Sequence, residues 1–445
     1  MTLFSIPAFP ARSIVCRTHR PSRLPWKKLA CLWTSLVLSF TAASNAAAVS
    51  PELSREALHA LETWLGAPSE SRPAFGDQSF GTVPLTKEDA ARAVELLWKE
   101  HASLIRANRD AELKAKVIEL DGHRMKFETV RFGEKIPPGG QSLFISMHGG
   151  GGAPAEVNDS QWRNQIKLAA GYQPREGIYV APRAPTDTWD LWHQAHIDGL
   201  FSRLIEDLIV VDNVNPNRVY LLGYSAGGDG VYQLAPRMAD RLAAAAMMAG
   251  HPNDASPLGL RNIGFAIQVG ANDAAYNRNK VAGEWGKRLD QLQQNDPAGY
   301  VHFSELHEGK GHWMEMADRK AIPWMEKLTR NPLPEKIVWH QDDVTHPRFY
   351  WLAEPQPRAG DEIVAERHQQ TITVTAPEGR TVIVRLNDAM LELDQPVTVI
   401  YNGKPAFAQR AARTIATLFS TLNELGDPEL IFSAEIKLPE NGTPR

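Results

Sequence analysis

The chain has 445 residues, more than a single hydrophobic core usually holds, so we expect more than one domain. Hydrophobic residues make up 43% and charged residues 22% of the sequence, which is the composition of an ordinary globular protein. The formal net charge is only −4, and no long basic run occurs after the amino terminus, so a nucleic-acid partner is not expected.

The first 48 residues have the pattern of an export signal. Six basic residues between positions 12 and 28 precede an apolar run over 29–43, and small residues follow at 44–48. This order predicts a signal peptide over 1–48 and a periplasmic or secreted protein. The apolar run is shorter than the roughly 20 residues that span a bilayer, so no membrane span is expected in the mature chain; an uncleaved anchor is the alternative. Both cysteines, Cys16 and Cys31, lie in this segment.

Residues 49–114 are expected to form a helical extension. Apolar residues recur at helical spacing over 90–105, and Thr86 can cap the start of this helix. Nothing in the segment indicates a catalytic role. We expect it to pack on the following domain or on the last one.

Residues 115–332 alternate between strand and helix patterns. An antiparallel hairpin over 117–130 is followed by apolar strand segments at 143–147, 177–181, 219–222, 242–248, 263–269 and 301–306, with an amphipathic helix over 198–211. This alternation predicts an α/β domain with a mostly parallel sheet, whose functional residues lie at the carboxyl ends of the strands.

A glycine-rich loop, residues 148–152, follows the first of these strand segments. His148 is succeeded by four glycines, and Ala153 stands where a phosphate-binding loop would need a lysine. Glycines allow backbone N–H groups to approach a substrate carbonyl closely, as in the oxyanion loops of lipases and esterases. We therefore interpret Gly149 and Gly150 as oxyanion-hole residues, with His148 as a candidate substrate contact.

Two tryptophans between the strand over 177–181 and the helix over 198–211 are candidates for a pocket wall. Trp189 and Trp192 could bound an acyl or sugar site, and ordinary aromatic packing is the alternative. Trp313, further along the chain, could likewise line a pocket or simply pack against neighbouring residues.

The segment Gly223-Tyr224-Ser225-Ala226-Gly227 joins an apolar strand to a helix. This is the pattern of a nucleophile elbow, in which a tight turn between small residues exposes the serine oxygen. Ser225 is the predicted nucleophile, and the N–H of Ala226 is the predicted second oxyanion donor.

The remaining members of the predicted triad follow the next strands. Asp273 lies just beyond the strand at 263–269, where it would orient an imidazole. His312 lies in a glycine-flanked loop after the strand at 301–306 and is the predicted general base; His307, at the strand end, is its competitor.

The last region, 333–445, changes to short alternating strands at 371–375, 381–386 and 397–401. Asn402-Gly403 predicts a hairpin turn, and residues 413–425 read as a helix. We expect a β-rich, sandwich-like accessory domain of the immunoglobulin kind that buttresses the preceding domain, with polymer or sugar binding as the alternative.

Taken together, residues 148–152, 223–228, Asp273 and 311–312 make the chain resemble the α/β-hydrolase superfamily, and within it the esterase and polyhydroxybutyrate-depolymerase-like branch. The resemblance covers about residues 115–330. It implies an α/β-hydrolase fold and hydrolysis of a small-molecule or polymeric carboxylic ester through an acyl-enzyme, without a metal or an organic cofactor.

Other classes of protein share parts of this pattern. His307 and His312 are five residues apart across two glycines, which excludes the i, i+4 helix of a zincin, and His193 and His196 have no third ligand. A serine peptidase of the prolyl-oligopeptidase type shares the elbow and the order of the triad, but no propeller repeats precede the domain. A non-catalytic binding module on a hydrolase scaffold is the third hypothesis. The particular ester and the oligomeric state do not follow from the sequence.

Overall fold

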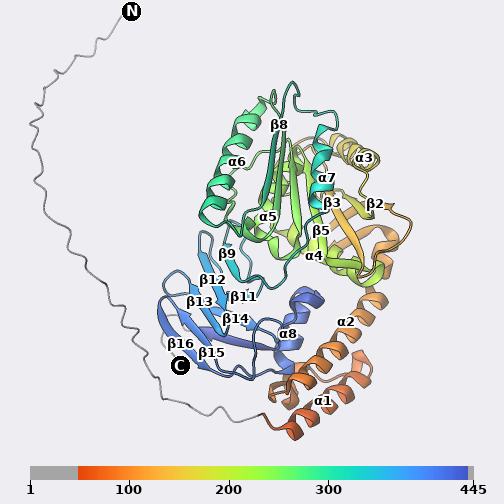
Figure 1. Cartoon of the computed structure of the whole chain (residues 1–445). Coiled ribbons are helices and arrows are strands. Elements are labelled where there is room, and N and C mark those ends of the chain that lie inside the picture. The colour runs from red at the N-terminus through yellow and green to blue at the C-terminus, as the bar shows by residue number, and fades with distance from the viewer. Residues whose placement is uncertain (1–48, 439–445) are drawn as a thin grey trace, which may run out of the picture. The chain divides into compact units, whose positions relative to one another are not determined.

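The computed structural model describes residues 49–438 (Figure 1). The predicted signal segment, both cysteines included, lies outside the described residues. Within the described part, none of the helices combines the length and the apolar character needed to traverse a bilayer.

The centre of the molecule is one sheet of eight strands in the order β1-β2-β4-β3-β5-β6-β7-β8. Only β1 and β2 run antiparallel to their neighbours, and every pair from β4 to β8 is parallel. The predicted hairpin and all six later strands are present. Their bounds are β1 Val117–Leu120, β2 His123–Phe132, β3 Gln141–Met147, β4 Gly177–Pro182, β5 Val214–Tyr224, β6 Ala244–Met248, β7 Gly264–Gly270 and β8 His302–His307.

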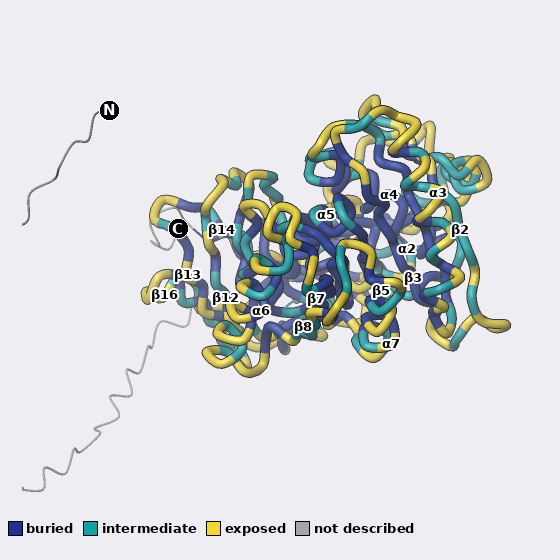
Figure 2. Tube along the Cα trace, turned by 90° about the horizontal axis from the view of Figure 1, so that it is seen from above, coloured by how far each residue is buried: buried dark blue, intermediate teal, exposed yellow. Residues whose placement is uncertain are grey.

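Helices cover both faces of this sheet, so every residue of β3, β6 and β7 is buried (Figure 2). In β3 the side chains of Leu143 and Ile145 join the cluster under α4, α5 and α6, while that of Phe144 joins the cluster under α3 and α7. The helix bounds are α3 Ala155–Tyr172, α4 Ala195–Asp212, α5 Ala226–Arg237, α6 Arg278–Asn295 and α7 Ala321–Met325.

The predicted helical extension consists of α1 (Pro51–Gly66) and α2 (Lys87–Ala115), joined by short 3-10 turns. Thr86 caps α2 by accepting a hydrogen bond from the N–H of Asp89. At 29 residues, α2 is about 43 Å long, enough to contact two partners. Its first half packs on α8 (Ile415–Leu425), and its second half packs on α4, where Arg109 pairs with Glu206. The extension therefore contacts both the sheet domain and the carboxyl-terminal region.

The carboxyl-terminal region forms two further sheets that share one core. Their orders are β16-β15-β13-β12-β9 and β10-β11-β14-β17, and the turn at Asn402-Gly403 joins β15 to β16 with both residues at positive φ, as predicted. Strand β13 pairs parallel with β15, which departs from the antiparallel immunoglobulin sandwich. The strands are β9 Lys336–His340, β10 Arg348–Phe349, β11 Leu352–Ala353, β12 Glu362–His368, β13 Thr371–Thr375, β14 Val382–Leu386, β15 Val397–Tyr401, β16 Lys404–Gln409 and β17 Ala434–Leu438.

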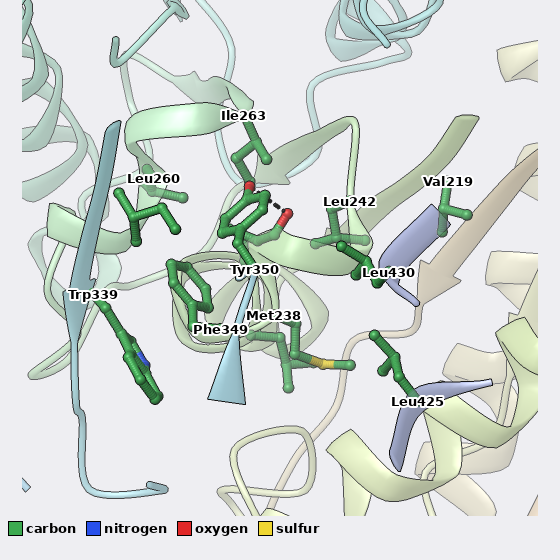
Figure 3. Packing of buried hydrophobic residues seen from close by; sticks show 14 of the residues in the cluster. Val219, Met238, Leu242, Leu260, Ile263, Trp339, Phe349, Tyr350, Leu425 and Leu430 are labelled. Atoms are coloured by element: carbon green, nitrogen blue, oxygen red, sulfur yellow. Dashed lines mark hydrogen bonds between the residues drawn. The ribbon is translucent and has the colours of Figure 1, made fainter. Parts of the chain in front are cut away.

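An apolar interface joins these sheets to the α/β domain. Figure 3 shows Trp339, Phe349 and Tyr350 packed beside residues of the α5–β7 segment, such as Leu260. The hydroxyl of Tyr350 donates to the carbonyl of Ala239 at 2.9 Å. One hydrophobic cluster runs through both regions, so the α/β domain and the carboxyl-terminal sheets share a continuous core.

A buried ion cluster reinforces this interface. The carboxylate of Asp427 accepts from Arg330 at 2.7 Å and from Arg241 at 3.2 Å, and each of the three side chains is at most 1% exposed. Arg241 follows α5, whereas Asp427 follows α8, so the cluster links distant parts of the chain. Breaking such a buried pair lowers the free energy of unfolding more than removing a surface pair does. The charge that remains is no longer neutralised by its partner, and it stays buried away from water.

We therefore expect Asp427→Ala to lower the free energy of unfolding by about 3–5 kcal/mol. The control is Glu119→Ala, which removes the exposed pair with Arg124 and should cost less than about 1 kcal/mol. Urea denaturation followed by circular dichroism measures both variants. An equal, small loss in the two would contradict a structural role for the cluster.

Candidate active site

Ser225 lies in a strained turn between β5 and α5. Its backbone has φ 60° and ψ −121°, a conformation that costs an L-residue about 1–3 kcal/mol. A Cβ on Gly223 would lie 2.2 Å from the carbonyl oxygen of Gly227, and one on Gly227 would lie 2.2 Å from that of Met147. Only glycine fits at these two positions, so the turn holds the Ser225 side chain at the carboxyl edge of the sheet.

A chain of hydrogen bonds connects Ser225 to a histidine and a carboxylate. The Nε2 atom of His312 lies 3.0 Å from Oγ of Ser225, and its Nδ1 lies 2.7 Å from Oδ2 of Asp273. Asp273 is 1% exposed and therefore fixes the imidazole from the buried side, while the His312 side chain is 43% exposed. With Nδ1–H donating to the carboxylate, Nε2 is left to accept the hydroxyl proton.

Tyr224 holds the loop that carries His312. Its hydroxyl donates to the carbonyl of His312 at 2.7 Å and accepts from the N–H of Met314 at 3.0 Å. The Asp273 loop is tied to the same segment, because the N–H of Asn272 donates to the carbonyl of Lys310 at 2.8 Å. These bonds fix the loops after β7 and β8 relative to the elbow.

His148 supports the glycine loop from beneath. Its Nδ1 donates to the Gly149 carbonyl at 2.6 Å, and its Nε2 accepts from the N–H of Ala184 at 3.2 Å, which sets the tautomer. In a trans peptide the N–H points opposite to the carbonyl, so the Gly150 N–H points away from this ring. The imidazole is fully buried, and burial lowers the pKa of His148 to about 4.

Asn158 on α3 closes the glycine loop. Its Oδ1 accepts from the N–H of Gly151 at 3.0 Å, and its Nδ2 donates to the Gly151 carbonyl at 3.0 Å and to Asp187 at 2.8 Å. Gly150 has φ 112°, and a Cβ there would lie 2.0 Å from Oδ1 of Asn158. The loop therefore requires glycine at position 150 and the buried side-chain amide of Asn158.

Two cavities open at Ser225. The first, of about 620 Å³, is bounded by Gly149, Gly150, His312 and Trp313. The second, of about 400 Å³, is bounded by Gly150, Ala226 and Trp189. As the first residue of α5, Ala226 has an N–H group without an intrahelical partner, at the positive end of the helix dipole.

The structure thus brings together Ser225, Asp273, His312 and the predicted oxyanion residues, but not every predicted contact. Of the four candidate substrate contacts, Trp189 and Trp313 are exposed and line the cavities, whereas His148 and Trp192 are fully buried and line neither. Trp192 instead donates to the His148 carbonyl at 2.9 Å. The expectation of a substrate contact is corrected for both: each packs under the glycine loop.

The competing histidines lie elsewhere. Nε2 of His307 is 2.9 Å from Oε1 of Gln268, in a buried pair at the ends of β8 and β7. The ring of His196 stacks on that of His123 at 3.8 Å, and His193 packs edge-on to Trp189. Over residues 49–438, no group of three or more His, Cys, Asp or Glu side chains is placed to hold a metal ion.

Sequence reasoning missed Asn158, Tyr224 as a loop anchor, and Arg278, whose Nη1 lies 3.8 Å from Oδ1 of Asp273. Tyr224 lies inside the elbow pentapeptide, and this position next to Ser225 could have indicated that its side chain supports the site. Asn158 and Arg278 belong to helices without any distinguishing local pattern, and only their contacts reveal them.

The chain is similar to known proteins over part of its length. No protein-family model matches the chain. A protein of Nocardia uniformis subsp. tsuyamanensis described as "Putative esterase NocK" is 30% identical over 129 residues, which is 27% of this chain and 38% of that relative. The matched part thus spans well under two thirds of the relative.

Among solved structures, a thermostable esterase aligns at a TM-score of 0.38 with 16% identity, over 48% of this chain and 62% of that chain. The Bacillus cereus carboxylesterase aligns at a TM-score of 0.34 with 15% identity, over 51% and 98% of the two chains. The strand order and the strand–turn–helix position of Ser225 are those of the α/β-hydrolases. The chain therefore has an α/β-hydrolase fold, with added helices at the amino end and β-sheets at the carboxyl end.

The buried neutral His148 gives folding stability a dependence on pH. Its pKa in the folded chain is about 4, below the unfolded value of about 6.5, so the unfolded state binds more protons between these values. The contribution of His148 is complete above pH 6.5 and is lost as the pH falls towards 4, by about 3 kcal/mol.

We expect His148→Asn to flatten the dependence of unfolding free energy on pH between 6.5 and 4, because asparagine does not titrate. Urea melts of both proteins at half-unit pH steps measure the two slopes. Identical slopes would show that the imidazole is not buried in its neutral form.

Proposed function

We propose that this protein is an exported serine hydrolase that cleaves carboxylic esters through an acyl-enzyme. The single observation that carries the proposal is the hydrogen-bond chain from Asp273 through His312 to Ser225, at 2.7 and 3.0 Å. The esterase description of the matched Nocardia protein is consistent with this activity. The basic, apolar and small-residue order of residues 1–48 supports export.

In the first half-reaction, His312 takes the hydroxyl proton through Nε2 while Oγ of Ser225 forms a bond to the ester carbonyl carbon. Asp273 stabilises the resulting imidazolium and keeps its orientation. His312 then gives the proton to the departing alcohol oxygen. In the second half-reaction, a water molecule repeats the sequence on the acyl-enzyme and releases the acid.

The developing oxyanion is stabilised by the N–H groups of Gly150 and Ala226. One preorganised donor of this kind contributes about 3 kcal/mol to the transition state. Because His148 and Asn158 fix the glycine peptides before substrate arrives, little reorganisation is needed during the reaction. The exposed His312 leaves the leaving group free to depart towards solvent.

We expect a fluorophosphonate probe to label the wild-type protein and not Ser225→Ala, since only the activated hydroxyl attacks phosphorus. His312→Ala should reduce kcat/KM for p-nitrophenyl acetate by about 10³-fold or more, because triad members act as one unit.

The matched control is His307→Gln, which replaces the competing histidine and should stay within about twofold of the wild type, because His307 contacts Gln268 rather than Ser225. Near-normal turnover by His312→Ala would remove this residue from the mechanism.

Ester and peptide cleavage are separated by comparing p-nitrophenyl acetate with a proline-containing peptide p-nitroanilide. We expect turnover of the ester and little of the anilide. Residues 49–115 form two helices and short turns. They contain no propeller blades, which a prolyl oligopeptidase would have before its catalytic domain. Preferential cleavage of the anilide would favour the peptidase.

A further inference from the structure

The two cavities at Ser225 differ in their relation to the base. His312 lines the larger cavity and not the smaller one. In ester cleavage the alcohol oxygen must lie where Nε2 of His312 can protonate it, and the acyl group extends to the other side of the carbonyl carbon. The larger cavity therefore receives the alcohol, and the smaller one, beside Ala226, receives the acyl group.

One face of α3 forms a wall of the alcohol cavity. Val157, Gln161, Asn164 and Leu168 lie at i, i+4, i+7 and i+11, so they follow one another along a single stripe. The eleven steps from Val157 to Leu168 extend over about 16 Å of helix, which is longer than a small alcohol needs.

The chemistry of this stripe is mixed. The carboxamides of Gln161 and Asn164 line the cavity, and each carries two donors and an acceptor that a ligand can use. Val157 and Leu168 supply apolar surface at the two ends. Trp313 lines the cavity beside His312; it is 51% exposed, and its ring lies tilted against that of Tyr224 with 5.6 Å between the centroids.

Charge is sparse in this cavity. Among residues 49–438, Lys167 is the only permanently charged side chain that lines it, and no carboxylate of these residues does. A cationic alcohol therefore finds no counter-ion there. A ligand that suits the cavity is long, carries no positive charge, and offers both apolar faces and many hydroxyl groups.

We infer that the alcohol half of the ester is a saccharide, bound with a sugar ring against Trp313 and its hydroxyl groups on Gln161 and Asn164. A pyranose ring has apolar C–H faces that pack on an indole and hydroxyl groups around its edge that both donate and accept. The length of the α3 stripe accommodates more than one sugar unit. This inference rests on the proposed ester hydrolysis and specifies its substrate class.

The test keeps the acyl group constant and varies the alcohol. The full chain is given acetylated glucose, acetylated cellotetraose, hexyl acetate and p-nitrophenyl acetate, and kcat/KM for acetate release is measured for each. We expect the cellotetraose ester to exceed hexyl acetate by about tenfold, and to exceed the glucose ester as well, because more of the stripe is occupied.

Two variants probe the stripe itself. Trp313→Ala and the double variant Gln161→Ala/Asn164→Ala should each reduce the ratio of cellotetraose ester to hexyl acetate by about tenfold, chiefly through KM. The control is Arg163→Ala on the same helix, because this exposed residue lines neither cavity and should leave the ratio unchanged.

The outcomes separate the two levels of the proposal. Hydrolysis of hexyl acetate as fast as the saccharide esters, or a ratio unaffected in the stripe variants, overturns the saccharide inference and leaves the esterase standing. Absence of acetate release from every ester, p-nitrophenyl acetate included, overturns the proposed function itself.

Discussion

The close approach of backbone at the turn between β5 and α5 is the constraint on which the rest of the site depends. The turn leaves no room for a side chain at Gly223 or Gly227, where a Cβ would meet a carbonyl oxygen at 2.2 Å. The strained backbone of Ser225 is maintained by its N–H bond to Met248 at the end of β6. Because the parallel strands end at one edge, the loops after β3, β7 and β8 converge on this serine.

Around that turn, the site is held by residues that do not touch the reacting atoms. Tyr224 fixes the base loop, Asn158 closes the glycine loop, and His148 orients the Gly149 carbonyl. These groups are buried and hydrogen-bonded, so their geometry is set by folding and not by substrate. Such support keeps the glycine peptides and the His312 loop in place, which the proposed electrostatic stabilisation of a transition state requires.

The parts outside the α/β domain are structurally continuous with it. Helix α2 contacts α8 with one half and α4 with the other, and Asp427 neutralises guanidinium groups that belong to separate segments. A shared apolar core runs beneath Trp339 and Tyr350 (Figure 3). The carboxyl-terminal sheets thus enlarge the core of the α/β domain, while among residues 49–438 the two cavities at Ser225 are lined only by residues of that domain.

Local patterns in the sequence were sufficient to predict most of the elements. Apolar runs bounded by glycine and polar residues located each strand of the central sheet, and Asn402-Gly403 located a hairpin, because these signals depend on a few neighbouring residues. The placement of Ser225, Asp273 and His312 after successive strands predicted that they would lie at one edge. The parallel pairing of β13 with β15 was not predicted, since pairing depends on segments far apart in the chain.

The sequence by itself therefore determined the strand–helix order, the elbow and the candidate residues, because each of these features can be recognised from a few neighbouring residues. Only the tertiary structure decided which histidine reaches Ser225, 87 residues away, and which tryptophans face a cavity. It also showed that His148 and Trp192, which were candidate substrate contacts, are buried beneath the glycine loop. The physical reason is that burial and hydrogen-bond partners are properties of the packed chain. They depend on contacts between distant segments, and the local sequence of one segment does not show which other segment it contacts.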